Sequence, residues 1–252
     1  MSLLAFFVFN LALVLAHPPH RVELATAKLA REVDGHRLTG KPMLKVTSPL
    51  EDMKITPGAS YTLYCEILSV PSAAVQWLFN GKRIQGSMEL NVEEKMLNLR
   101  HKYVESGILA STYTIENPSE KDSGVYTCVA YNGHDTVRSD AEIEVVGDEA
   151  AEVKPTEGAA PRIVQWTESR FEMQGNVATL VCRSNTPSEW TWTFEGEKIN
   201  SKIGRYQIMP YGDLRIYDIA WEDMGEYFCT ARNQFGEIRQ ETFLYPTAKK
   251  EE

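Results

Sequence analysis

Hydrophobic and polar residues alternate along two separate stretches of this chain, and such alternation is typical of β-strands with one buried face. In the first half, apolar side chains occupy every second position from Tyr61 to Ile67. In the second half, two sets of residues interleave along a mostly apolar stretch: Val177, Thr179 and Val181 with Ala178, Leu180 and Cys182. The pattern predicts an all-β fold with two separate groups of strands.

Within residues 1–16, an apolar run begins at Leu3 and is interrupted only by Asn10. A membrane-spanning helix needs about 20 apolar residues, so this run is short for a span. Val14 and Ala16 suit a signal-peptidase site, which would make His17 the first residue of the mature chain. We therefore expect a signal peptide and a secreted, extracellular protein, with an uncleaved anchor as the alternative. No second apolar run follows, so the sequence predicts no membrane anchor.

Residues 17–41 precede the first group of strands as an N-terminal extension. Within it, four apolar residues recur at helical spacing: Val22, Ala25, Leu29 and Val33. Two interpretations stay open for the extension. It is either a frayed segment or a short amphipathic helix that docks on a partner or on the first domain.

Four cysteines are present, and no C-x-x-C motif among them suggests zinc or redox chemistry: Cys65, Cys128, Cys182 and Cys229. By number alone, four cysteines allow three pairings. In each half a tryptophan follows the first cysteine, at Trp77 and Trp192, and an Asp-x-Gly-x-Tyr-x-Cys run contains the second. The same framework therefore occurs twice along the chain.

This doubled framework resembles immunoglobulin domains of the intermediate type (I-set) and covers residues 42–247. The resemblance implies two tandem β-sandwiches joined by a flexible linker, with disulfides Cys65–Cys128 and Cys182–Cys229 connecting the sheets of each. It also implies that Arg205 pairs with Asp223, whereas the first domain has no equivalent arginine. The residues with implied structural roles are Trp77, Tyr126, Trp192, Tyr227, Asp122, Asp223 and Arg205.

The organisation that follows has six parts: a signal peptide (1–16), the extension (17–41), the first immunoglobulin-like domain (42–147), a linker (148–160), the second domain (161–247) and a charged tail (248–252). The linker is rich in small residues, proline and acidic residues, which is typical of an exposed hinge. Such a linker lets the two sandwiches reorient or fold back, so the sequence predicts no fixed interdomain angle.

The first domain carries an insertion, because 51 residues separate Trp77 from Cys128 and only 37 separate Trp192 from Cys229. One interpretation is a pair of longer C′ and D strands. The other is an added edge or flap against which another polypeptide pairs. The candidate binding surface consists of the apolar residues of this insertion: Met88, Leu90, Val92, Met96, Leu97 and Leu99.

The composition and the motifs argue against nucleic-acid binding and against catalysis, which leaves recognition of another molecule by the protein surface as the expected function. The net charge is −9, without a long Lys/Arg cluster, so we expect no nucleic-acid partner. The histidines are scattered along the sequence, each cysteine is assigned to a disulfide, and the sequence has no recognisable catalytic motif. We therefore expect that the protein is not an enzyme and holds no metal or cofactor. Trp166 and Trp221 are the tryptophans outside the two cores, and we expect both to be partly buried packing rather than interface anchors.

The short chain with two such domains also resembles the nematode zwei Ig family of secreted two-immunoglobulin proteins, and it is similar to the insect neural/ectodermal development factor ImpL2. The family resemblance implies a secreted cue that maintains axon and neuron position through contacts with an extracellular or cell-surface protein. Similarity to ImpL2 implies an alternative, in which the protein sequesters an insulin-like peptide and modulates its signalling. A plain matrix or structural role is a third possibility.

Overall fold

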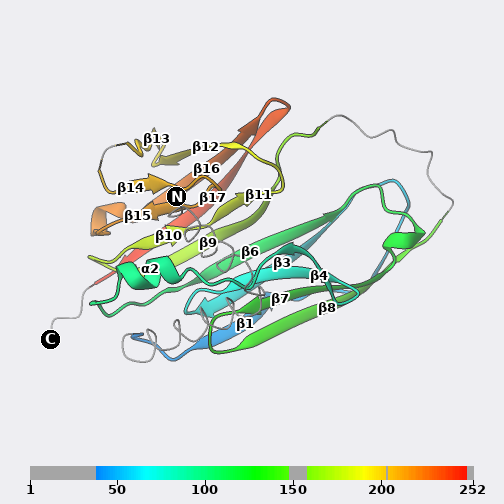
Figure 1. Ribbon diagram of the computed structural model, residues 1–252, viewed down its shortest axis with the longest axis horizontal. Coiled ribbons are helices and arrows are strands. Elements are labelled where there is room, and N and C mark those ends of the chain that lie inside the picture. The colour runs from blue at the N-terminus through cyan, green and yellow to red at the C-terminus, as the bar shows by residue number, and fades with distance from the viewer. Residues whose placement is uncertain (1–37, 148–157, 203, 249–252) are drawn as a thin grey trace, which may run out of the picture.

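The computed structural model describes residues 38–147, 158–202 and 204–248 (Figure 1). The expected signal peptide, most of the N-terminal extension and most of the linker lie outside these residues. Within them, no helix has the length and apolar character needed to cross a membrane.

The first sandwich is formed by the following elements: β1 (Met43–Ser48), β2 (Met53–Ile55), β3 (Tyr61–Val70), β4 (Ala74–Phe79), β5 (Lys82–Gly86), α2 (Val92–Leu97), β6 (Ser106–Ile115), η1 (Glu120–Asp122), β7 (Gly124–Tyr131) and β8 (Thr136–Val145). One sheet has the strand order β1-β3-β6, and the facing sheet has the order β2-β8-β7-β4-β5. Alternate residues of β3 are buried, as the period-two pattern predicts.

The core of the first sandwich is built around the Cys65–Cys128 disulfide, as predicted. Trp77 is 1 % exposed and its indole N–H donates a 2.9 Å hydrogen bond to the Ser111 hydroxyl. The Tyr126 hydroxyl donates to the backbone carbonyl of Asp122 at 3.0 Å. This bond ties the turn before β7 to the strand itself, which is the tyrosine-corner arrangement of immunoglobulin-like sandwiches.

The second sandwich is formed by the following elements: β9 (Ile163–Met173), β10 (Ala178–Leu180), β11 (Cys182–Ser184), β12 (Glu189–Phe194), β13 (Glu197–Lys198), β14 (Tyr206–Ile208), β15 (Leu214–Ile216), η2 (Trp221–Asp223), β16 (Gly225–Asn233) and β17 (Gly236–Thr247). One sheet has the order β9-β17-β16-β12-β13, and β10-β15-β14 forms the facing sheet. The first part of β9 pairs with β11, and its last part pairs in parallel with β17.

The second core repeats the plan of the first. Cys182 and Cys229 form the predicted disulfide, and Trp192 is fully buried beside it. The Tyr227 hydroxyl donates to the carbonyl of Asp223 at 3.0 Å. Arg205 donates two hydrogen bonds to the Asp223 carboxylate, at 2.7 and 2.8 Å. Both halves are therefore immunoglobulin-like sandwiches.

The two sandwiches share one continuous sheet, an arrangement that the sequence left open. β6 of the first sandwich pairs antiparallel with β9 of the second, from Ser106 opposite Phe171 to Ser111 opposite Gln165. The resulting strand order is β1-β3-β6-β9-β17-β16-β12-β13, and β6 lies next to β9 in Figure 1. Because these backbone hydrogen bonds fix the register, the chain folds back on itself with a defined interdomain geometry.

Candidate functional site

The insertion of the first domain forms a short helix where a longer D strand was one expectation, so that part of the expectation is wrong, whereas the C′ strand β5 is longer than its counterpart β13. After β5 the chain turns into α2, whose N-terminal cap is Asn91. The Asn91 side-chain oxygen accepts from the Glu94 backbone N–H at 3.2 Å, and Glu93 and Glu94 place negative charge in the first turn. Both features stabilise a helix start. The alternation of apolar residues favours a strand, but the Asn91 cap and the acidic first turn stabilise a helix instead.

The six apolar residues proposed as a binding surface do not share one exposed face. Leu90 is buried, whereas Met88, Val92 and Leu99 are half-buried. Only the remaining two, Met96 and Leu97, are exposed. The role of the six apolar residues as a contact surface stays a prediction. The polar residues between them contact the second sandwich.

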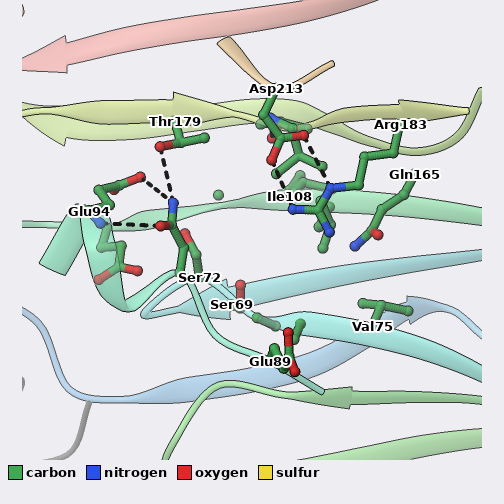
Figure 2. A pocket seen from close by; sticks show the side chains of 18 of the residues that line it. Ser69, Ser72, Val75, Glu89, Glu94, Ile108, Gln165, Thr179, Arg183 and Asp213 are labelled. Carbon is green, nitrogen blue, oxygen red and sulfur yellow. Dashed lines mark hydrogen bonds and ion pairs between the residues drawn. The ribbon is translucent and has the colours of Figure 1, made fainter. Parts of the chain in front are cut away.

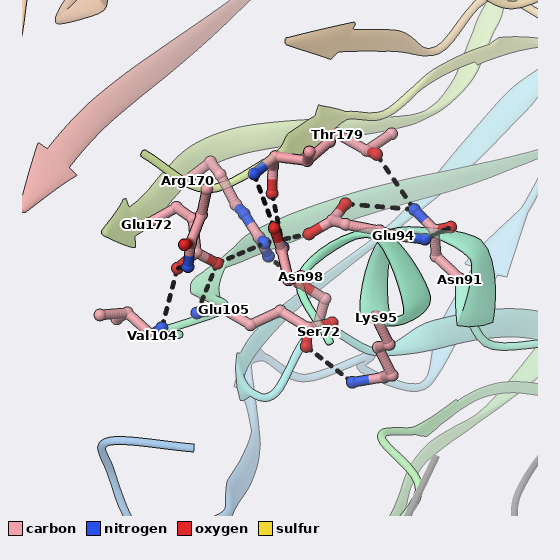
Figure 3. Close-up of polar contacts among 12 residues, drawn as sticks. Ser72, Asn91, Glu94, Lys95, Asn98, Val104, Glu105, Arg170, Glu172 and Thr179 are labelled. Atoms are coloured by element: carbon pink, nitrogen blue, oxygen red, sulfur yellow. Dashed lines mark hydrogen bonds and ion pairs between the residues drawn. The ribbon is translucent and has the colours of Figure 1, made fainter. Parts of the chain in front are cut away.

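Those polar residues hold the helix against the second sandwich. Arg170 on β9 is 2 % exposed, and its guanidinium donates to Glu94 of α2 and to Ser72. The same group donates to Glu172 at 3.0 Å, and Figure 3 shows Arg170 between these two carboxylates. Farther out, Arg215 pairs with both carboxylate oxygens of Glu93 at 2.8 Å. The insertion therefore contacts this chain's own second domain.

Further contacts complete this interdomain joint. Asn98 and Val177 exchange two hydrogen bonds, of 2.7 and 2.9 Å, between the amide side chain and the backbone. Buried Lys95 bonds to buried Glu105 at 2.6 Å. The Glu172 carboxylate accepts from the backbone N–H groups of Val104 and Glu105, at 2.9 and 3.0 Å. Buried polar groups stabilise an interface only when they are paired in this way.

Burial sets the acidity of the carboxyls in the joint. It raises the pKa of Glu94, Glu105 and Glu172, and the nearby cations Arg170 and Lys95 only partly oppose it. The cluster thus combines three acidic groups with two cations. Because removal of a charge from water is costly, burial shifts each of these carboxyl groups toward its neutral form, while the ion pairs with Arg170 and Lys95 oppose that shift.

A polar cavity of about 70 Å³ lies between the sandwiches beside this cluster (Figure 2). Its lining comes from both domains, with Ser69 on one side and Thr179 and Arg183 on the other. Arg183 bonds to Asp213 at 2.8 Å, and Asn91 bonds to Thr179 at 3.1 Å. This space suits a few water molecules rather than a ligand.

The outer face of the shared sheet carries a group of exposed aromatic side chains. Phe243 and Tyr245 point outward from β17, Phe171 points outward from β9, and Trp221 lies in η2. Their exposed fractions are 36, 38, 38 and 48 %. The Tyr245 ring lies 5.6 Å from that of Phe171 and 6.0 Å from that of Trp221. We call these four residues the aromatic face.

An apolar row continues the aromatic face into the first sandwich. Phe171 lies opposite Ser106 of β6, and the next strand presents Val70, whose partner on β1 is Met43. Val70 is half-buried and Met43 is 42 % exposed. These residues meet on one surface only because β6 pairs with β9. Ser106 separates Phe171 from Val70 in this row, so the exposed apolar group with ring-to-ring contacts is the aromatic face itself. Clustered exposed apolar residues of this kind are typical of interaction sites.

Sequence reasoning did not identify this surface, because it placed the candidate contacts in the insertion and expected Trp221 to be packing rather than an interface anchor. Trp166 is buried against the second core, but Trp221 is about half exposed and belongs to the aromatic face. Phe243 and Tyr245 were missed, although they flank the inward-facing Leu244 and must therefore face outward. The alternation around Leu244 could therefore have predicted that both aromatic side chains are exposed. The contribution of Phe171 had no signal, because it depends on the pairing of distant strands.

Comparison with known proteins gives the family. The immunoglobulin domain model matches residues 41–132 and 160–233. Zwei Ig domain protein zig-4 of Caenorhabditis elegans is 50 % identical over 252 residues, covering 99 % of each chain. This chain belongs to the zwei Ig family. Zwei Ig domain protein zig-3 of the same species is 49 % identical, covering 95 % of this chain and 96 % of the relative.

A solved structure supports the two-domain arrangement of this zwei Ig protein. The crystal structure of neural ectodermal development factor IMP-L2 superposes with a TM-score of 0.66 and 26 % identity, covering 83 % of this chain and 97 % of that one. The Drosophila melanogaster sequence of this factor is 25 % identical over 221 residues. Family and fold indicate an extracellular, non-enzymatic protein that binds or adheres to other proteins.

Proposed function

We propose that this zwei Ig protein is secreted and maintains axon and neuron position by binding a cell-surface protein through the aromatic face. The observation that carries the proposal is the group of four exposed aromatic side chains at the sheet that both domains share. Aromatic residues dominate the energy of protein interfaces, because they bury large areas with little loss of side-chain freedom. The neuronal role rests on membership of the zwei Ig family.

Rigid presentation also supports recognition at this surface. Phe171 lies next to β6, so its strand has a neighbour on both sides, and Tyr245 lies on the long strand β17. Side chains on paired strands lose less freedom on binding than side chains on loops. The aromatic face is therefore suited to a protein partner with a complementary apolar patch.

The test compares two double variants of the secreted chain for binding to neuronal cells. Phe243→Ser/Tyr245→Ser should weaken binding about 30-fold, which corresponds to about 2 kcal/mol for the loss of two interface anchors. Glu237→Ser/Glu241→Ser is the matched control, because both glutamates are exposed on the same side of β17. Equal binding by the aromatic variant and the wild type would contradict the proposal.

Sequestration of an insulin-like peptide is the second candidate, and the structural similarity to IMP-L2 across both sandwiches favours it. In this second candidate function, the binding partner is a soluble peptide instead of a cell-surface protein. Calorimetric titration of the purified protein with insulin-like peptides separates the two candidates. Nanomolar peptide binding together with no binding to neurons would favour sequestration; no peptide binding at micromolar concentration would eliminate it.

A further inference from the structure

A second, wider space opens between the domains where the pairing of β6 with β9 ends. This space, which we call the interdomain groove, has a volume of about 380 Å³. The first domain lines it with residues 84–87 and Ser111, and the second domain lines it with residues 164–165 and 183–185. It shares three lining residues, Gln165 among them, with the smaller polar cavity. None of its lining residues belongs to the aromatic face.

Strand register places Gln165 at the centre of the groove. Gln165 on β9 lies opposite Ser111 of β6 on one side and opposite Arg183 of β11 on the other. Directly opposed residues of antiparallel strands point to the same face of a sheet. These three polar side chains therefore form a row that crosses the domain boundary. The pair Ser111–Gln165 is also the last one between β6 and β9, so the sheet opens beside this row.

The Gln165 side chain is an unpaired polar group within this row. Gln165 is only 8 % exposed. Among the residues that the structure describes, none forms a hydrogen bond with its amide group, and no dashed line reaches this amide in Figure 2. Buried amide groups normally have a hydrogen-bond partner. An unpaired amide that lines a groove is therefore suited to bind a ligand.

The polar lining of the groove favours a neutral ligand with hydroxyl groups. Arg183 is the ionisable residue of the lining, and it donates to Asp213 at 3.2 and 2.8 Å, which balances its charge. Asn185 accepts from the Arg162 backbone N–H at 2.8 Å through its side-chain oxygen, so its amide nitrogen remains to donate. Gln165 can both donate and accept. A hydroxyl group also does both, whereas a carboxylate only accepts and an ammonium group only donates.

The size and the apolar part of the groove also fit a sugar ring. Its volume lies within the range of about 300 to 1,000 Å³ that is typical of small-ligand sites. Ile84 and Val164 are half-buried and add apolar surface to the lining. A monosaccharide combines several hydroxyl groups with the apolar C–H face of its ring. The two kinds of surface in the groove therefore match the two kinds of surface on a sugar.

We propose that the interdomain groove binds one neutral monosaccharide unit of an extracellular glycan, with the Gln165 amide as its central hydrogen-bonding group. Both domains contribute to the site, so the site exists only while β6 and β9 are paired. The proposal does not rest on the aromatic face or on the neuronal role.

The test is an NMR titration of the full secreted chain with the methyl glycosides of glucose, galactose, mannose and N-acetylglucosamine. The side-chain NH₂ signals of Gln165 should shift and saturate with at least one of them, with a dissociation constant of about 1 to 10 mM because a single sugar makes few contacts. No shift of these signals with any of the four glycosides at about 50 mM would overturn the proposal.

Gln165→Met is the variant that isolates the amide. It keeps the length of the side chain and removes its donor and acceptor, so sugar binding should weaken at least about tenfold. The melting temperature should stay that of the wild type, because no hydrogen bond within the protein is lost. Gln234→Met is the control, since Gln234 is exposed in the turn between β16 and β17 and lies outside the groove. Equal sugar affinity of Gln165→Met and the wild type would overturn the proposal.

A second variant blocks the groove and leaves the amide in place. Ser87 lines the groove and is half-buried, so the ring of Ser87→Phe should occupy part of the volume and abolish sugar binding. Sugar binding that persists in Ser87→Phe would place the sugar elsewhere and overturn the proposal. Phe243→Ser/Tyr245→Ser should bind the sugar like the wild type, because the aromatic face lies outside the groove. The sugar site and the proposed function therefore fail in different experiments.

Discussion

At the residue scale, Asp223 shows how one carboxylate organises a turn. It accepts from Arg205, from the Tyr206 hydroxyl at 2.9 Å and from the Ala220 backbone N–H at 2.7 Å. Burial opposes ionisation, but these hydrogen bonds outweigh it and hold the pKa of Asp223 below its ordinary value. Asp122 of the first domain caps its turn through Ser119 instead, since no arginine takes the position of Arg205.

This arrangement makes a prediction about pH. Asp223→Asn should lower the free energy of unfolding at pH 7 by about 2 kcal/mol, because it removes charge-assisted hydrogen bonds. A lowered folded pKa means that the stabilisation is present above the ordinary value of 3.8 and disappears as the pH falls through the folded pKa. In urea melts at decreasing pH, the stability difference between the two proteins should therefore start to shrink once the pH falls below about 4. A difference that stays the same from pH 7 down to pH 3 would contradict the assignment.

A second residue-scale feature is a pair of carboxylates that meet across the domain boundary. The Tyr64 hydroxyl contacts Glu66 at 2.9 Å and Glu168 at 2.8 Å. One hydroxyl proton satisfies only one carboxylate at a time. Burial and the neighbouring Glu66 raise the pKa of Glu168, whereas the Thr47 hydroxyl helps to lower that of Glu66. Glu168 is therefore the member that gains a proton first.

Glu168→Gln should consequently stabilise the chain at pH 7, by up to about 1 kcal/mol because the site is partly open to solvent. A raised folded pKa means that wild-type stability is complete below the ordinary value of 4.5 and falls as the pH rises through the folded pKa. The gain should therefore vanish near pH 4 in thermal melts. Destabilisation at pH 7 would show that Glu168 is stabilised as a charged group.

At the element scale, the pairing of β6 with β9 requires a residue without a side chain. A β-carbon at Gly107 would collide with the carbonyl oxygen of Ser169 on the neighbouring strand. The glycine thus permits the two backbones to approach to hydrogen-bonding distance. The absence of a side chain at Gly107 is therefore one requirement of the pairing between the two domains.

Gly107→Ala should therefore weaken the joint while leaving each sandwich folded. We expect a loss of about 1 to 3 kcal/mol, because the backbone must shift to admit the methyl group. Faster amide exchange in β6 and β9, with unchanged exchange in β7 and β16, is the specific signature. Gly40→Ala is the control, since a β-carbon there would make only an ordinary 3.7 Å contact with Val70. Slow exchange at β6 in Gly107→Ala would contradict this role.

The sequence predicted some of these elements correctly and others wrongly. Alternation around Cys65 and the two Asp-x-Gly-x-Tyr-x-Cys runs predicted both sandwiches and both disulfides, because these signals are local. The insertion was misassigned because its apolar residues fit a strand, whereas the groups that place α2 are Arg170 and Arg215 of the other domain. Contacts between residues about 80 to 120 positions apart leave no periodic trace in one sequence.

At the scale of the whole molecule, the two domains form one rigid unit that shares a continuous sheet. The joint combines backbone pairing of β6 with β9, the buried cluster around Arg170 and the contact of α2 with the second sandwich. Interdomain motion is the usual expectation for domains on a linker, unless the interface is extensive. Here the interface continues a sheet, so the aromatic face and the apolar row keep a fixed relation.

The most direct test of this claim is the measurement of NMR residual dipolar couplings for backbone amides of both domains in the wild-type chain. Couplings from residues 42–145 and from residues 161–247 should fit a single alignment tensor, because the shared sheet holds both sandwiches in one orientation. Two tensors of different magnitude or direction would show that the domains reorient independently. In that case, no surface spanning both domains could act as one binding site.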